Sequence, residues 1–97
     1  MASRYQVIWL HLALHDLSEI GEFIAQEDDK LARKIAKQIW QAGQSLSRYP
    51  ERARIGRVPG TRELVLAGLP FFIAFRVVSD TIQILRIIHT ARRWPPQ

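Results

Sequence analysis

Residues 71–88 have the sequence FFIAFRVVSDTIQILRII, and this stretch decides the fold. Both halves are rich in β-branched and aromatic residues, a composition that is typical of strands. Ser79-Asp80 forms a tight turn between the halves. We therefore expect strands at Phe71–Val78 and Thr81–Ile88, paired as a β-hairpin.

The first of these strands has two apolar faces. One face should meet helices and the other should point away from them, because side chains alternate along a strand. The two sets are Phe71, Ile73, Phe75 and Val77 on one face and Phe72, Ala74, Arg76 and Val78 on the other. A small domain has little left to cover the second face, although edge loops could hide part of it. We interpret this face as a partner surface that includes Phe72 and Arg76.

Upstream of the hairpin, Thr61–Ala67 is predicted to be another strand, broken from the next by Gly68-Leu69-Pro70. The segment 49–60 contains two prolines and two glycines and is expected to be a loop. This loop carries three arginines, which are Arg52, Arg54 and Arg57.

The N-terminal half has helical periodicity after a short strand at Arg4–Leu10. Apolar residues spaced for one helical stripe predict a helix from about Leu12 to Gln26. A second helix should begin after a cap at Asp28 or Asp29 and run to about Arg48, since the residue ahead of Pro50 avoids the helical region. The short link between the helices predicts an antiparallel helical hairpin.

The element order is therefore β-αα-βββ, which predicts the α+β class. We expect one domain spanning 1–97, with the helical hairpin packed on one face of a mostly antiparallel four-stranded sheet. Arg86 interrupts an apolar row of Ile82, Ile84 and Ile88, and a buried aliphatic stem with its head at the rim is favoured over a functional role. The residues expected to be largely buried are Ile20, Ile24, Ile35, Ile39, Ile73, Phe75, Ile82 and Ile84.

The formal net charge of +5 is unevenly distributed. Residues 1–29 sum to −5 and residues 30–97 to +10, and 11 of the 14 basic residues are arginine. Such a field suits an acidic protein segment or a nucleic acid backbone, although a solvated basic surface would have the same composition.

No cysteine is present, which favours a cytoplasmic location over an oxidising one. No apolar stretch is long enough to span a membrane. No metal-binding spacing and no phosphate-binding glycine loop occurs, so we expect neither a metal nor a cofactor.

The cluster with the most functional promise follows the last strand. His89, Arg92, Arg93 and Trp94 form a basic, aromatic tail, and Arg62 opens a neighbouring strand. Such a group can bind phosphates and stack on bases, or it can bind an acidic protein segment. A frayed basic terminus is the alternative without function.

Over about residues 5–95 the chain resembles toxins of the RelE/ParE superfamily from type II toxin–antitoxin pairs. The resemblance rests on the order and spacing of short motifs. These are Trp9 at the end of the first strand, Asp16-Leu17-x-x-Ile20, Phe23-Ile24-Ala25, Leu46-x-x-x-Pro50, Gly60-Thr61-Arg62-Glu63-Leu64-Val65, Phe75-Arg76-Val77 and Ile84-Leu85-Arg86-Ile87-Ile88-His89-x-x-Arg92-Arg93-Trp94-Pro95.

This resemblance implies one of two activities and a common partner. RelE-like members cut messenger RNA in the ribosome, whereas ParE-like members inhibit DNA gyrase and lack a nuclease site. Both are neutralised by an antitoxin, ParD-like or RelB-like, whose acidic C-terminal segment wraps the toxin. Operator DNA is bound only through the antitoxin.

The residues favour the ParE branch. RelE-like nucleases usually carry an arginine at the entry to the strand that corresponds to Phe71–Val78, and none is present there. No lysine follows Lys37 and no tyrosine follows Tyr49. A nuclease would have to use His89, Arg92 and Arg62, with Glu63 as a weaker proton carrier.

We therefore expect a gyrase inhibitor whose target and antitoxin contacts involve Arg62, Phe72, Arg76, Arg92, Arg93 and Trp94. A ribosome-dependent endoribonuclease is the alternative. A third possibility is a protein that only binds its antitoxin.

Overall fold

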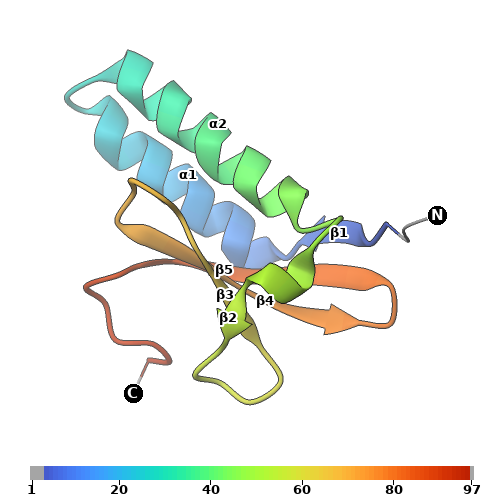
Figure 1. Cartoon of the computed structure of the whole chain (residues 1–97). Coiled ribbons are helices and arrows are strands. Elements are labelled where there is room, and N and C mark those ends of the chain that lie inside the picture. The colour runs from blue at the N-terminus through green and yellow to red at the C-terminus, as the bar shows by residue number, and fades with distance from the viewer. Residues whose placement is uncertain (1–3, 97) are drawn as a thin grey trace.

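A five-stranded sheet forms the centre of the fold. The computed structural model describes residues 4–96. In Figure 1 a helical hairpin lies on one side of this sheet and the C-terminal tail lies on the other. The strand order is β1-β5-β4-β3-β2, and the strands are β1 (Gln6–Trp9), β2 (Arg54–Ile55), β3 (Arg62–Val65), β4 (Phe71–Val78) and β5 (Thr81–His89). Residues 1–3 and 97 of the predicted single domain lie outside the described residues.

The sheet corrects the four-stranded prediction in two ways, while the α+β class is confirmed. First, β1 pairs with β5 in parallel, whereas every other neighbouring pair is antiparallel. Second, β2 lies inside the segment 49–60, which was expected to be only a loop. Two residues cannot display an alternating pattern, so β2 is detectable only through its pairing, in which Arg54 lies opposite Glu63.

The helical hairpin agrees closely with the periodicity of the sequence. Helix α1 spans His11–Ala25 and helix α2 spans Asp29–Ser45. The side chain of Asp28 caps α2 by accepting a hydrogen bond from the amide of Leu31 at 3.0 Å. Helix α2 ends before the predicted Arg48, because the next three amides bond to carbonyls three residues back and tighten the chain into turns.

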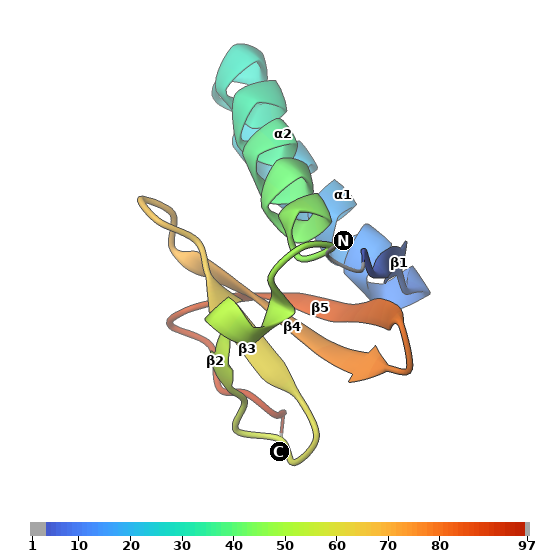
Figure 2. The same ribbon diagram turned by 45° about the vertical axis from the view of Figure 1, so that its right-hand side comes forward.

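The helical hairpin packs against the sheet mainly through contacts between α1 and β5. Figures 1 and 2 show that the loop joining the two helices projects beyond the sheet edge. The core between the layers is formed by fully buried residues of α2, β4 and β5, as predicted for Ile39, Ile73, Phe75, Ile82 and Ile84.

Three residues that were expected to be largely buried are only half-buried. Ile20, Ile24 and Ile35 lie on the helical hairpin toward its projecting end. Because the sheet does not extend beneath that end, these side chains line a groove, and Ile20 and Ile35 also pack against the margin of the core.

The β4–β5 hairpin contains a bulge that sequence periodicity did not reveal. Ala74 lies opposite Arg86 while the next residue, Phe75, lies opposite Ile84, so Leu85 is the extra residue on β5. The bulge shifts the alternation of β5. Ile88 therefore points away from the helices, and the predicted apolar row of Ile82, Ile84 and Ile88 is wrong at its last member.

Trp9 connects β1 to α2. Its ring stacks on that of Trp40 with 4.7 Å between centroids, and its indole N–H donates to Gln44 at 2.8 Å. Gly43 is buried beneath this ring, and a Cβ there would collide with Trp9 and lie 2.9 Å from Ile84. The absence of a side chain at Gly43 therefore allows the helix to approach the sheet.

Neither helix within residues 4–96 has the length and apolar character that crossing a membrane would require.

Candidate partner and target surfaces

A groove of about 580 Å³ separates the projecting end of the hairpin from the sheet. Most of its lining is apolar, with Phe71 of β4 facing Ile20, Ile24 and Ile35 of the helices across it. Asp16 and Glu19 of α1 also line it. Phe23 at its border is 74% exposed, which is unusual for so large an apolar side chain. The groove is therefore suited to an apolar segment of a partner.

His89 and Arg92 stand together at the sheet side of this groove. The His89 ring meets Phe71 edge-on, with 5.5 Å between centroids, and its Nδ1 accepts a hydrogen bond from the amide of Ala91 at 3.0 Å. In a neutral ring the proton then lies on the exposed Nε2. The amide of Arg92 donates to the carbonyl of His89 at 2.9 Å, so the tail turns tightly and keeps both side chains at the groove.

Arg86 has a structural partner on the opposite wall. Its guanidinium donates two hydrogen bonds to Asp16 of α1, at 2.7 and 2.9 Å, and these bonds raise the pKa of Arg86 above its ordinary value. The same carboxylate accepts the amide of Ile87 at 3.0 Å. Because β1 ends opposite Ile84, Asp16 takes the place of a strand partner at this part of the β5 edge. The sequence favoured a structural role for Arg86, with its charged head at the rim of the core. The structure confirms a structural role and adds an ion pair between that head and Asp16.

The outer face of the sheet, which points away from the helices, is not the open apolar surface that was expected. Phe72 and Ala74 are fully buried and Ile88 is nearly so. Trp94 folds back from the tail to pack against them. Phe72 is therefore a support for this face and not an exposed contact, and the indole N–H of Trp94 has no partner within residues 4–96.

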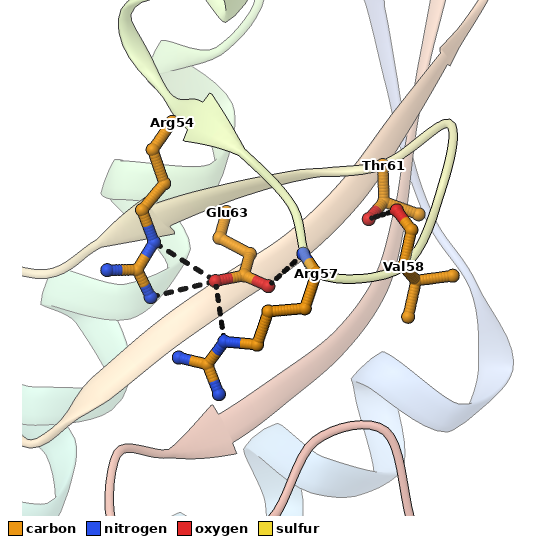
Figure 3. Close-up of polar contacts among 5 residues, drawn as sticks. All are labelled: Arg54, Arg57, Val58, Thr61 and Glu63. Carbon is orange, nitrogen blue, oxygen red and sulfur yellow. Dashed lines mark hydrogen bonds and ion pairs between the residues drawn. The ribbon is translucent and has the colours of Figure 1, made fainter.

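A cluster of Arg54, Arg57 and Glu63 covers the rest of Phe72 (Figure 3). Glu63 Oε1 accepts two hydrogen bonds from Arg54, at 3.0 and 2.7 Å, and lies 3.6 Å from Nε of Arg57. Its Oε2 accepts the backbone amide of Arg57 at 3.0 Å. Both guanidiniums lie over the Phe72 ring, 5.6 and 5.1 Å from its centroid. One buried carboxylate thus fixes two half-exposed cations.

The environment of Glu63 argues against the proton-carrying role considered for it. Burial alone would raise its pKa, but the amide of Arg57, the hydrogen bonds from Arg54 and the two positive charges lower the pKa below the ordinary value. A carboxylate held in its charged form by two arginines is a poor general acid or base near neutral pH.

The remaining predicted contacts have separate environments. Arg62 is partly buried and donates to the carbonyl of Ala53 at 2.8 Å, which fixes β3 against the start of β2. Arg76 is exposed and donates to Gln83 at 2.6 Å. Arg93 is exposed on the tail.

The structure brings His89 and Arg92 together but not Arg62. His89 lies opposite Phe71, whereas Arg62 lies opposite Phe75, whose partner on β5 is Ile84. Five residues along β5 and two strand spacings separate the two positions, which amounts to roughly 15–20 Å. One reacting phosphate could not touch both His89 and Arg62.

Sequence reasoning missed the cluster on the outer face. It noted Arg54 and Arg57 only as basic loop residues. A usable signal existed, because Glu63 is the sole acid between Glu51 and Asp80 and lies among arginines. Without β2, however, nothing in the sequence indicated that these side chains would meet.

A small α+β domain with a helical hairpin, a twisted sheet, a groove and a basic tail defines a toxin fold of the RelE/ParE class. Residues 7–94 match the family described as the ParE toxin of the type II toxin–antitoxin system parDE, and the chain belongs to this family.

Similar proteins include named toxins. The candidate toxin Y4kP of Sinorhizobium fredii is 39% identical over 93 residues, which is 96% of either chain. Toxin RelE2 of Caulobacter vibrioides is 38% identical over 87 residues, covering 90% of this chain and 97% of its own.

Two solved structures extend the comparison. A chain from the chromosomal ParDE system of P. aeruginosa superimposes with a TM-score of 0.82 at 30% identity, covering 89% of this chain and 96% of that one. A chain from the RelBE2 toxin–antitoxin complex of Mycobacterium tuberculosis shares the fold, with a TM-score of 0.63 at 22% identity over 95% of this chain and 98% of that one.

Proposed function

We propose that this chain inhibits DNA gyrase, acting in the cytoplasm, and that a cognate ParD-like antitoxin neutralises it. The observation that carries the proposal is the dispersal of the groups that a nuclease would need. His89 and Arg92 stand at the groove, Arg62 is tied to a backbone carbonyl elsewhere, and Glu63 is held by two arginines. A protein that acts by binding its target needs no such constellation.

The antitoxin is expected to occupy the groove. An amphipathic segment would place apolar side chains between Phe71 and the helices and an acidic side chain near Arg92. The basic sum of +10 over residues 30–97 suits an acidic C-terminal segment. Both solved relatives come from toxin–antitoxin systems, which supports a partner of this kind. Operator DNA would be bound only through that antitoxin.

The contacts with gyrase are expected to centre on the exposed tail. Arg92 and Arg93 are exposed on the tail, and Trp94 fixes the course of the tail by packing on the outer face. Arg76 adds a separate exposed cation on β4. Phe72 would support this surface from beneath, since it is buried against Trp94. Arg62 is tied to Ala53 at the other end of the strands, so it would hold β2 and β3 together and not contact the tail.

Supercoiling by purified gyrase tests the proposal. The protein should inhibit supercoiling, and its antitoxin should restore it. Arg92→Ala should weaken inhibition by about fivefold or more, which corresponds to the loss of an anchor worth about 1 kcal/mol. Arg33→Ala, which removes an exposed cation on α2, should leave it unchanged. Unimpaired supercoiling in the presence of a folded, antitoxin-binding protein would contradict the proposal.

A ribosome-dependent endoribonuclease is the second candidate. It is favoured by the adjacent positions of His89 and Arg92, which could act on a single phosphate without Arg62. In that case His89→Ala should slow messenger RNA cleavage by about 10²–10³-fold, as loss of a general acid does. Antitoxin affinity should fall much less, because the apolar side chains of the groove keep their contacts.

A further inference from the structure

We propose that the open edge of β2, together with Arg54 and Arg57, binds an extended acidic peptide segment as a sixth strand of the sheet. This inference rests on the proposed function in one respect, because the acidic peptide segment would come from the antitoxin. The site itself is distinct from the groove, since none of its residues line that groove.

The first argument is the charge of the cluster. Two guanidiniums share one carboxylate, so the cluster keeps a net charge of +1, and the two arginines repel each other. Both side chains are 48% exposed, while Glu63 is 1% exposed. A second anion on the solvent side would complete the neutralisation that Glu63 begins.

The second argument is the direction of the unused donors. Nε and Nη2 of Arg54 bond to Glu63. Among residues 4–96, neither Nη1 of Arg54 nor either terminal nitrogen of Arg57 has a protein acceptor within hydrogen-bonding distance. Figure 3 shows the outer nitrogens of both residues pointing away from Glu63. Glu63 and the Phe72 ring hold these donors in place, so a carboxylate would meet a preorganised pair.

The third argument is the backbone of β2. The amide of Gly56 bonds to the carbonyl of Thr61 at 2.8 Å, which continues the antiparallel ladder between β2 and β3. Hydrogen-bonded and non-bonded pairs alternate in such a ladder, so Arg54 bonds to Glu63 and Ile55 does not bond to Arg62. The amide and carbonyl of Ile55 therefore point toward the open edge of the sheet. No strand lies beyond β2 in the described part of the chain.

The fourth argument is the alternation of side chains on β2. Arg54 lies on the outer face with Glu63, and Ile55 points to the opposite face, where it is 74% exposed. A strand added here would place an acidic residue beside Arg54 and an apolar neighbour beside Ile55. A nucleic acid backbone could use the arginines but neither the free amide nor the exposed isoleucine. These three features together favour a peptide.

The test uses the full chain and a defined probe. The probe is an eight-residue peptide of alternating Glu and Val, with a Lys–Val peptide and an oligothymidylate of twelve nucleotides as comparisons. Titrations would be followed by ¹H–¹⁵N spectra and hydrogen exchange. We expect the Glu–Val peptide to bind, to shift resonances from Ala53 to Arg57, and to slow exchange of the Ile55 amide.

Two variants separate the contributions of backbone and charge. Ile55→Pro removes the outward amide but no bond to β3, and proline is tolerated on an edge strand. It should weaken binding by about tenfold, whereas Ile55→Val should not. Arg57→Gln should weaken binding by about tenfold at low salt and make binding less sensitive to salt, because one screened attraction is lost, whereas Arg33→Gln should have no effect. Wild-type-like spectra outside β2 would establish that each variant is folded.

Three outcomes would overturn the proposal. These are absence of peptide binding, binding that survives both Ile55→Pro and Arg57→Gln, and saturation of the same residues by the oligothymidylate without binding of the peptide. The outcome is independent of the proposed function. If the chain binds the peptide but leaves gyrase active, this site stands and the proposed target is wrong. If the chain inhibits gyrase but does not bind the peptide, the proposed target stands and this site is wrong.

Discussion

Glu63 is charged and lies on a strand of a small sheet, yet it is among the most buried side chains of the chain. An isolated carboxylate in such a place would be costly. Here four hydrogen bonds or charge contacts from Arg54 and Arg57 compensate for the lost water. At the scale of single residues, the cluster makes the outer face stable and leaves it cationic.

Glu63→Gln should lower the stability by about 1–3 kcal/mol at neutral pH, because it removes the charge that two cations share. The effect should depend on pH. The pKa of Glu63 is lowered in the folded state, so its stabilisation is complete above the unfolded value of about 4.3 and is lost as pH falls through the lower folded value. Urea unfolding of both proteins at pH 7 and near pH 3 measures this.

The stability difference between wild type and Glu63→Gln should therefore shrink in acid. Glu51→Gln serves as the control, because Glu51 is exposed in the same region and should cost little at either pH. An equal difference at both pH values would show that the charge of Glu63 is not what stabilises the cluster.

At the scale of elements, the sequence was most informative where patterns were long. The predicted strand Phe71–Val78 agrees with the structure at both ends, and the helices agree to within one residue except at the end of α2. Strand β2 and the bulge at Leu85 were not predictable, because each depends on which backbone lies alongside and not on local composition. The buried state of Phe72 was missed because its cover comes from Trp94 of the tail and from Arg54 and Arg57, and no local pattern shows that these residues meet it.

Surrounding side chains also decide the effect of a substitution at the two glycines within helices, Gly21 and Gly43. Gly43→Ala should destabilise the protein by about 1–3 kcal/mol, because the new methyl group would collide with Trp9 and Ile84. Gly21→Ala should stabilise it by up to about 1 kcal/mol, because nothing lies within 4 Å and alanine favours the helix. Thermal or urea unfolding of the pair gives the sign directly. A stable Gly43→Ala variant would contradict the tight approach of α2 to β1.

At the scale of the whole molecule, charge is divided between α1 and the rest of the chain. Six of the nine acids lie in residues 16–29, whereas α2 carries four basic residues and the sheet and tail are basic as well. This division was evident from the sequence. The candidate site was only partly predictable from the sequence. His89 and Arg92 do meet at a groove, whereas Arg62 lies at the other end of the strands. The Arg54–Glu63–Arg57 cluster was not predicted.

Association with the antitoxin should reflect this division of charge. Basic residues at the rim mainly speed the encounter with an acidic segment, so the association rate should fall by about tenfold or more between low and physiological salt. The dissociation rate should change much less, because the apolar groove determines it. Stopped-flow or biosensor kinetics over a salt series measures both. An association rate that is insensitive to salt would contradict the electrostatic part of the account.

The central claim about function is the proposal that this chain inhibits gyrase, which rests on the separation of Arg62 and Glu63 from the His89–Arg92 pair. One measurement tests it most directly. The same preparation of protein is added to a gyrase supercoiling reaction and to translating ribosomes, with messenger RNA ends mapped by primer extension. We expect supercoiling to stop and messenger RNA to remain intact. Cuts aligned with codons, present with the wild-type protein and absent with His89→Ala, would contradict the account and establish the chain as a nuclease.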